Sequence, residues 1–197
     1  MKLSDYVAEF LVSKNIQDIF MVTGGGAMHL NHSLGSHPKL NTTYLHHEQS
    51  CAMAAEGYAR LGLKLAVVNV TTGPGGLNSL NGVFGAYTDS IPMLIISGQV
   101  KTETMARYSG LNLRQLGDQE WDIVSTVKTM TKYAEVVSDK NQIKFDNKTR
   151  NSKNNLNSRS SKANEKDTLN DNTEEVLICT VCNIDLNGKI APLSVKE

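Results

Sequence analysis

The sequence has no excess of charge, no long apolar run and little cysteine, and each absence narrows the functions open to it. Lysine plus arginine and aspartate plus glutamate both number 20 in 197 residues, so the formal net charge is zero. Proteins that bind nucleic acids or membrane surfaces usually carry an excess of basic residues, so we expect neither kind of partner. No apolar run is long enough to span a bilayer, and residues 1–5 do not open a signal-peptide core. We therefore expect a cytoplasmic protein.

Cysteine is scarce, and its spacing does not indicate a disulfide framework. The chain has three cysteines, at Cys51, Cys179 and Cys182. Cys51 lies in an alanine-rich stretch and is expected to be a small buried thiol. Cys179 and Cys182 form one Cys-x-x-Cys pair, which is half of a tetrahedral zinc site, and no second pair follows. We therefore expect no metal site, and the role of this pair stays open.

Apolar runs alternate with helical patterns at close intervals up to residue 139. The run at 65–70 is typical of a strand buried on both faces. The expected strands are residues 19–22, 41–47, 65–70, 92–97 and 133–137, and the expected helices are one capped by Ser4 and then residues 28–34, 48–61, 77–87 and 120–127. Such alternation predicts right-handed crossovers and a parallel sheet. The expected fold class is α/β, an open parallel sheet with helices on both faces.

The composition changes abruptly at Lys140. Residues 140–175 contain nine asparagines and only five residues that are Ala, Ile, Leu or Phe. Ordering such a stretch costs more conformational entropy than its burial returns. We therefore expect one domain over residues 1–139 and an Asn- and Lys-rich tail over residues 140–197 that is disordered or aberrant. A short strand at 176–178 is too isolated to found a second domain.

Two segments near the N-terminus combine polar residues or glycines with the ends of expected strands. The segment Phe20 to Gly26 runs from a strand into three glycines, which indicates either a tight turn or close approach of a ligand to the backbone. His46, His47 and Glu48 lie where a strand meets a helix. Glu48 would be stabilised there by the helix dipole alone. Neighbouring residues on a strand point to opposite faces, so the two histidines do not indicate a metal site.

Two further segments lie at the ends of the next strands. Residues 71–78, Thr-Thr-Gly-Pro-Gly-Gly-Leu-Asn, lead from a strand into a helix and could hold an anion on free backbone amides. This loop is neither a Walker A loop nor a Gly-x-Gly-x-x-Gly turn, which argues against a nucleotide-binding fold. The segment Asp89 to Val100 is an apolar strand with polar ends.

Taken together and in this order, these segments resemble the N-terminal domain of acetolactate synthase and its relatives among the thiamine-diphosphate enzymes. The resemblance rests on Phe-x-x-x-Gly-Gly at 20–25, His47-Glu48-Gln49, the stretch 54–60, the Gly-Pro-Gly loop with Asn78, Asp89-Ser90-Ile91-Pro92 and Ser97-Gly98-Gln99-Val100. Gln119-Glu120 and Thr131-Lys132-Tyr133 extend it to about residue 139.

The resemblance implies that the domain binds the aminopyrimidine half of thiamine diphosphate. In the family, the glutamate matched by Glu48 hydrogen-bonds a ring nitrogen and so activates the cofactor. The cofactor then carries the chemistry, and the protein supplies placement and electrostatics. The implied site residues are Glu48 and Gln119 as catalytic groups, Glu48, Gly73 and Asn78 as cofactor-binding groups, and Gly25 and Gly26 on the substrate side.

The sequence departs from the family pattern at three places. The family usually has Tyr-Pro where this chain has Val22-Thr23, and Phe where it has Asp118. Both places lie near the substrate, so the 2-oxo acid that is used stays open, pyruvate included. The third departure is that no Gly-Asp-Gly follows, the family motif that holds magnesium against the diphosphate in a separate domain. Flavin, which some relatives carry outside this domain, stays open as well.

These departures predict the N-terminal fragment of an enzyme that joins or cleaves carbon–carbon bonds of 2-oxo acids. We expect the chain to be inactive alone and to need a homodimer or a partner chain with the diphosphate-binding domain. A truncated or frameshifted gene product and one half of a split enzyme are both consistent with the sequence. The alternative from another class is a non-catalytic remnant or interaction module that keeps the fold without turnover.

Overall fold

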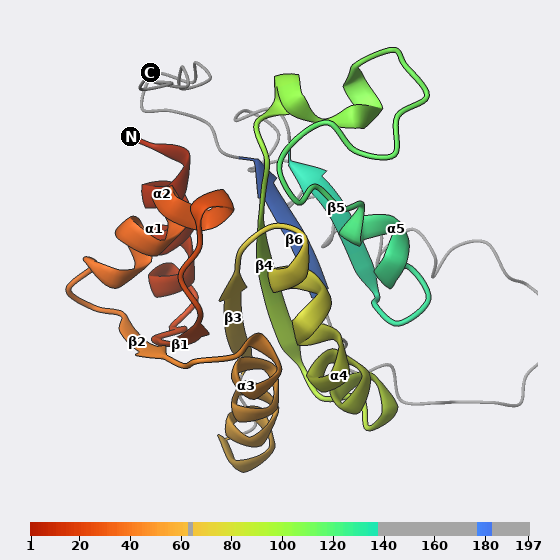
Figure 1. The fold of residues 1–197 in the computed structure, drawn as a ribbon. Coiled ribbons are helices and arrows are strands. Elements are labelled where there is room, and N and C mark those ends of the chain that lie inside the picture. Colours follow the sequence, from red (N-terminus) through yellow and green to blue (C-terminus); the bar gives the residue numbers. More distant parts are fainter. Residues whose placement is uncertain (63–64, 138–176, 183–197) are drawn as a thin grey trace, which may run out of the picture.

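The computed structural model of the protein describes residues 1–62, 65–137 and 177–182, which form a parallel sheet between layers of helices (Figure 1). The strands are β1 (Asp18–Met21), β2 (Asn41–Tyr44), β3 (Ala66–Val70), β4 (Met93–Gln99), β5 (Tyr133–Val137) and β6 (Leu177–Cys182). The helices are α1 (Leu3–Ser13), α2 (Met28–Gly35), α3 (Glu48–Gly62), α4 (Pro74–Thr88) and α5 (Ile123–Val127), with short 3₁₀ turns η1 (Gly25–Ala27), η2 (Thr102–Thr104) and η3 (Ala106–Tyr108). The strand order is β2-β1-β3-β4-β6-β5, and all neighbours are parallel.

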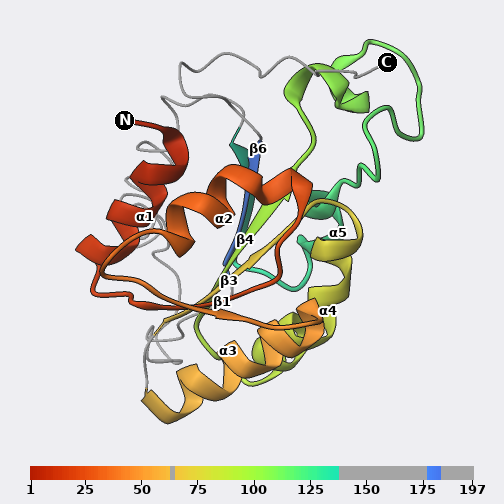
Figure 2. The same cartoon turned by 60° about the vertical axis from the view of Figure 1, so that its left-hand side comes forward.

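The sheet is covered on both faces, as the sequence predicts. Figure 2 shows α1 and α2 on one side and α3 and α4 on the other. Successive residues of a strand point to opposite faces, so Val67 packs with α1 and α2 while Val68 packs with α3, α4 and α5. Ile96 and Ile95 of β4 divide between the two cores in the same way. No helix in these described ranges is long and apolar enough to cross a membrane.

The ends of several elements differ from the predicted ones for local reasons. The residue that precedes α1 is Lys2, and its side chain makes no capping hydrogen bond. Ser4 is therefore not the predicted cap: it is buried, and its Oγ accepts a hydrogen bond of 2.8 Å from Ser33 of α2. α5 begins three residues later than predicted because Asp122 caps it by accepting a hydrogen bond from the Ser125 amide.

Strand β6 lies in the segment that the sequence assigns to the tail, and the predicted domain boundary at residue 139 stays a prediction. Residues 177–182 were expected to lie in the tail, yet β6 pairs with β4 over six residues and with β5 over five. The local run Leu-Ile-Cys-Thr-Val-Cys favours a strand. Its partners in the sheet are remote in sequence, and the residues around it are polar, so the sequence alone does not predict that it joins the sheet. The prediction of a disordered tail for residues 140–176 and 183–197 falls outside the described residues.

The order of the strands creates a switch point beside β1. β1 pairs with β2 on one side and with β3 on the other. The chain leaves β1 toward α2 on one face of the sheet, and it leaves β3 toward α4 on the opposite face (Figure 2). Open parallel sheets bind ligands at such a point, beyond the carboxyl ends of the strands. The segments after β1 and β3 are therefore where the topology favours a site.

Helices α3 and α4 cross at a contact that has no room for a side chain. A Cβ atom on Gly82 of α4 would lie 2.5 Å from the Cβ of Ala52 and 2.9 Å from the backbone of α3. A Cβ atom on Gly57, within α3, would meet nothing within 4 Å. Close approach of the two helices therefore depends on Gly82.

We predict that Gly82→Ala is less stable than Gly57→Ala by about 1–3 kcal/mol, the usual cost of overpacking a close contact. Both changes gain the same helix propensity, about 1 kcal/mol, so the difference isolates the crossing. Urea unfolding of both variants measures it. Equal stabilities would show that the two helices are not in this contact.

Candidate functional site

Glu48 is a buried carboxylate where two helices begin. It is the first residue of α3 and only 8% exposed. Its Oε2 accepts a hydrogen bond of 3.0 Å from the side-chain amide of Asn78, in the second turn of α4. No other described residue donates a hydrogen bond to this carboxylate. Oε1 therefore has no partner among the described residues and can accept a hydrogen bond from a ligand. His47, the residue before α3, accepts a hydrogen bond from the Gln49 amide through its Nδ1.

The glycine loop after β3 keeps the space beside Glu48 free of side chains. A Cβ atom on Gly75 would lie 3.6 Å from Oε1 of Glu48 and 2.7 Å from Cγ2 of Thr71. Gly73 has a φ of +53°, which residues with a side chain rarely adopt. A Cβ atom there would also lie 1.9 Å from the backbone carbonyl oxygen of Gln119. The loop therefore requires glycine at Gly73 for both its backbone conformation and its contact.

The glycine turn after β1 packs against the same loop. The backbone amide of Gly26 donates a hydrogen bond of 3.0 Å to Oγ1 of Thr71. A Cβ atom on Gly24 would lie 2.4 Å from the Cβ of Thr71, whereas one on Gly25 would meet nothing within 4 Å. The predicted pair Gly25 and Gly26 therefore has two different environments, one open and one closed by the β3 loop.

Gln99, at the end of β4, ties the third segment to the loop after β3. Its Oε1 accepts hydrogen bonds from the Thr72 hydroxyl at 2.5 Å and from the Val100 amide at 2.9 Å. Its Nε2 donates to the backbone carbonyl of Trp121 at 2.9 Å. Because Gln99 is buried and both polar atoms of its side chain are bonded, it holds the backbone at Trp121 against the end of β4.

Glu120 holds the long segment between β4 and α5 together through hydrogen bonds within that segment. Its carboxylate accepts hydrogen bonds from the backbone amides of Ala106 at 2.8 Å, Leu116 at 3.0 Å and Gly117 at 3.3 Å. Three amides on one carboxylate link the 3₁₀ turn η3 to residues 116 and 117. The adjacent Gln119 then has a φ of +54° and an exposed side chain.

The structure brings some of the predicted site residues together and leaves others apart. Glu48 and Asn78 are in direct contact, and Gly73 belongs to the loop that borders them. Gln119 contacts Gly73 through its backbone carbonyl, and among the described residues no hydrogen bond joins its side chain to Glu48. Gly25 is exposed and has no such contact either. The catalytic and substrate roles of these residues stay predictions.

A pair of asparagines, one buried and one half-buried, supports the site, and it was missed in the sequence. Asn69 of β3 is fully buried and donates a hydrogen bond of 2.7 Å to Oδ1 of Asn31. The Asn31 amide in turn donates to the backbone carbonyl of Gly24 at 3.3 Å. The signal was present, because Asn69 is the one polar residue in a strand whose other residues are Ala and Val.

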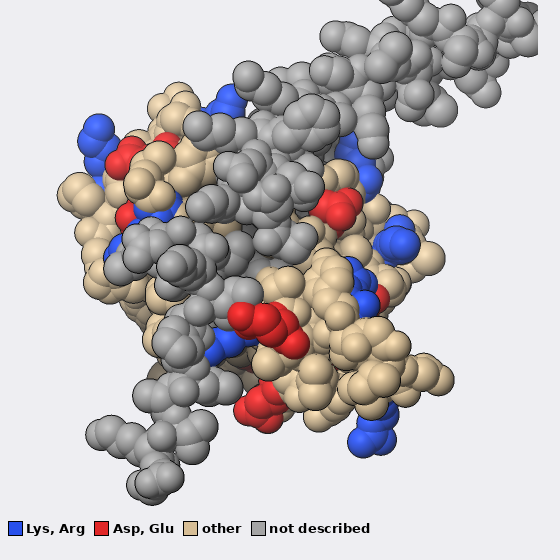
Figure 3. All heavy atoms as spheres, turned by 90° about the horizontal axis from the view of Figure 1, so that it is seen from above, with Lys and Arg blue, Asp and Glu red and all other residues tan. Residues whose placement is uncertain are grey.

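The charge of Glu48 acts on the neighbouring helix turn. Burial raises the pKa of the Cys51 thiol to about 11, and the negative charge of Glu48 adds to this rise. Seen from above the carboxyl ends of the strands, acidic and basic side chains are scattered over the described surface without a large patch of one sign (Figure 3). Across the described ranges, no group of three or more His, Cys, Asp or Glu side chains is placed to hold a metal ion.

Comparison with known proteins agrees with this arrangement. Residues 1–125 match the family described as thiamine pyrophosphate enzyme, N-terminal TPP binding domain. The chain therefore belongs to this family of thiamine-diphosphate-dependent proteins, as its motifs predict. Among its relatives is the acetolactate synthase large subunit of Buchnera aphidicola from Schizaphis graminum, 34% identical over 134 residues, which are 68% of this chain and 22% of the relative.

Two other relatives give the same picture from distant organisms. Acetolactate synthase 1, chloroplastic, of Oryza sativa is 33% identical over 141 residues, or 70% of this chain and 20% of the relative. The acetolactate synthase isozyme 3 large subunit of Escherichia coli is 30% identical over 134 residues, or 68% of this chain and 22% of the relative. The match to this chain thus spans about a fifth of the length of these curated relatives.

We predict that Gly73→Ala destabilises the protein more than Gly110→Ala. Both glycines have positive φ, +53° and +72°, but a Cβ atom on Gly110 would meet nothing within 4 Å. Positive φ disfavours alanine at both positions, but Gly73 also has a ψ of −112°, outside the left-handed helical region, and its Cβ would push the Gln119 carbonyl away, at a further cost of at least about 1–3 kcal/mol. Urea unfolding measures both variants. A loss at Gly110 as large as that at Gly73 would contradict the contact.

We also predict that Glu48→Gln lowers the pKa of Cys51, since it removes a negative charge that disfavours the thiolate. The raised pKa means that the thiol stabilises the fold below pH 9.0, its ordinary value, and that this contribution is lost as the pH rises to about 11. Thiolate absorbance against pH, with Cys179 and Cys182 replaced by alanine, measures the pKa. Glu9→Gln is the matched control and should leave it unchanged.

Proposed function

We propose that this chain supplies the pyrimidine-binding side of a thiamine diphosphate site in an acetolactate synthase-like enzyme. The observation that carries the proposal is the buried Glu48 carboxylate, which has one oxygen bonded to Asn78 and the other free of partners among the described residues. Family membership makes a ring nitrogen of an aminopyrimidine the natural hydrogen-bond partner of that free oxygen, with one proton shared between them.

The residues around Glu48 fit such a ring in their chemistry. A carboxylate can share a proton with a ring nitrogen, and Asn78 fixes the orientation of the carboxylate by bonding its other oxygen. Gly75 leaves the approach to Oε1 free of a side chain. When bound, thiamine diphosphate supplies carbanion chemistry, and the part of Glu48 is to hold the proton at the ring nitrogen.

The proposed reaction joins or cleaves a carbon–carbon bond of a 2-oxo acid. Gly25, Gly26 and Gln119 are the proposed substrate-side groups. Support comes from their segments, which follow β1 and precede α5 and both pack against the loop that borders Glu48. An exposed Gln119 side chain and an open Gly25 are consistent with contacts to a ligand rather than to the protein.

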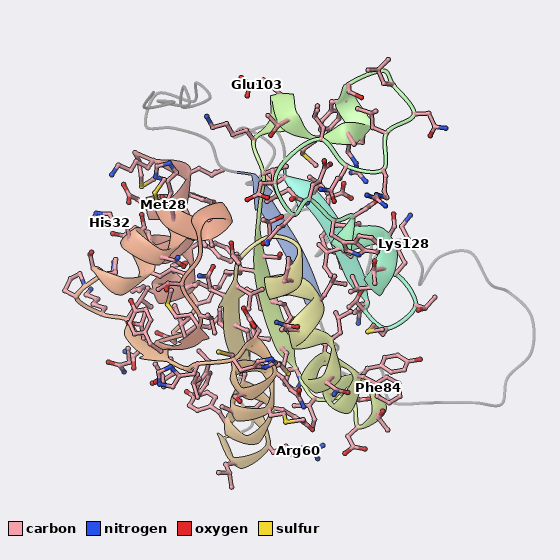
Figure 4. The ribbon with its side chains drawn as sticks, in the orientation of Figure 1. Met28, His32, Arg60, Phe84, Glu103 and Lys128 are labelled. Atoms are coloured by element: carbon pink, nitrogen blue, oxygen red, sulfur yellow. The ribbon has the colours of Figure 1, made fainter. Side chains whose placement is uncertain are left out.

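The diphosphate and magnesium would be held by a second domain, which a partner chain would supply. An exposed apolar face on α3 and α4 supports a docking place for it. Met53, Phe84 and Tyr87 are 48%, 57% and 50% exposed, and Figure 4 shows Phe84 on the outer side of α4. Exposed apolar patches of this kind mark interfaces. Leu77, about two turns before Phe84, is 36% exposed and extends the face toward the N-terminal end of α4, the end that carries Asn78.

Titration of the full chain with thiamine diphosphate and magnesium tests the proposal. Without the second domain we expect weak binding, in the millimolar range or about −4 kcal/mol. Nuclear magnetic resonance should show shifts of the Glu48, Gly75 and Asn78 amides on addition of the cofactor. Glu48→Gln should abolish these shifts, and the control Glu9→Gln should keep them.

Two results would contradict the proposal. One is a folded protein whose amides around Glu48 do not respond to the cofactor at any concentration. The other is an equal response in Glu48→Gln and in wild type. Either result would favour a protein that keeps the fold of the family as an interaction module.

A further inference from the structure

A hollow of about 300 Å³ lies on the segment between β4 and α5, which projects above the sheet in Figure 1. Leu111, Leu113 and Trp121 form its apolar wall. Arg107 and Arg114 bring two guanidinium groups to the same space. The volume is at the lower end of the range for small-molecule sites, about 300–1,000 Å³. Neither Glu48 nor Asn78 lines it, so it is separate from the proposed cofactor contacts.

The walls of this hollow are held in place although they lie outside the α-helices and strands. Glu120 bonds the amides of Ala106, Leu116 and Gly117, which closes the segment on itself. The indole Nε1 of Trp121 donates a hydrogen bond of 2.9 Å to Oγ1 of Thr126 in α5, which fixes the ring. A site built in advance loses less conformational entropy when a ligand binds.

Three of the four charged groups in the hollow already have partners. The guanidinium of Arg107 donates to Asp122 at 2.8 Å. Burial alone would raise the pKa of Asp122, but hydrogen bonds from Ser125 and the charge of Arg107 lower it below its ordinary value, so this pair stays ionised. The Glu120 carboxylate is engaged by backbone amides. Arg114 is exposed and has no hydrogen bond or ion pair within the part of the chain that the structure describes.

We propose that this hollow binds a small organic acid with one negative charge and an apolar body. The carboxylate would take a two-pronged hydrogen bond from Arg114, and the apolar body would cover Leu111, Leu113 and Trp121. The guanidinium fork matches a carboxylate, and the wall offers nothing polar to a longer or more highly charged ligand. A single charge fits because Arg107 and Asp122 pair with each other and Glu120 is engaged by backbone amides, which leaves Arg114 as the one charged group of the lining without a partner among the described residues. This site goes beyond the proposed function, since its ligand needs neither the cofactor nor Glu48.

Trp121 gives a direct test, because it is the single tryptophan of the sequence. Its fluorescence is followed while the full chain is titrated with 4-methylpentanoate. The uncharged 4-methylpentan-1-ol, acetate and inorganic phosphate serve as comparison ligands. We expect saturable quenching by 4-methylpentanoate with a dissociation constant of about 1 mM or below. The alcohol, acetate and phosphate should each bind at least about tenfold more weakly, because each lacks the charge, the apolar body or both.

The variants separate this site from a general charge effect. Arg114→Gln should weaken binding at least about tenfold. Arg114→Lys should have an affinity between those of wild type and Arg114→Gln, since lysine keeps the charge but lacks the two-pronged guanidinium group. Lys128→Gln, an exposed cation just after α5 (Figure 4), should bind as wild type does. Glu48→Gln should also bind as wild type, so failure of the cofactor site leaves this result intact. Circular dichroism confirms that each variant is folded.

Three outcomes would overturn the proposal. The first is absence of saturable quenching up to about 10 mM, which is weaker than about −3 kcal/mol. The second is equal binding of the acid and the alcohol, which would mean apolar contact only. The third is an equal effect of Arg114→Gln and Lys128→Gln, which would mean that no specific guanidinium contact is made.

Discussion

The turn after β3 leaves no space for a side chain, and the geometry of the whole carboxyl edge follows from this constraint. Gly73 has positive φ, and the Gln119 carbonyl occupies the place where its Cβ would be. Thr71 and Thr72, just before it, bond the turn after β1 and the end of β4. One short turn therefore sets the positions of three segments that come from distant parts of the sequence. The parallel sheet makes this possible, because it brings the ends of β1, β3 and β4 to one edge.

Glu48 gains its properties from this edge rather than from its own helix alone. The macrodipole of α3 would stabilise any carboxylate in its first turn, exposed or not. The glycine loop and Asn78 add burial, a fixed orientation and one oxygen without a partner among the described residues. Oε1 is not among the buried polar atoms that lack a partner, so it stays accessible beside the glycine loop, and a ligand can bond it without displacing a protein donor. This open acceptor is the physical reason for assigning Glu48 to the binding of a cofactor rather than to structural stability.

The sequence predicts most of the fold because burial imposes a repeating pattern on each element. The strands at Ala66–Val70 and Met93–Gln99 and the helices that follow them are expected within a few residues of their ends. Features that depend on distant partners are not predictable in this way. Examples are β6, which pairs with strands remote in sequence, and the bonds of Asn69, Gln99 and Glu120. Within the site, the family motif identifies Glu48 and Asn78, whereas the contact of Gln119 with Gly73 becomes visible only in three dimensions.

The contact between Glu48 and the ring nitrogen of the cofactor is the central claim, and a double cycle tests it most directly. Thiamine diphosphate and an analogue with carbon in place of that nitrogen are titrated into wild type and into Glu48→Gln. If the two groups bond each other, each change alone weakens binding, and the second adds little once the first is made. Losses that simply add would contradict the account, because they would show that Glu48 and the ring nitrogen act independently.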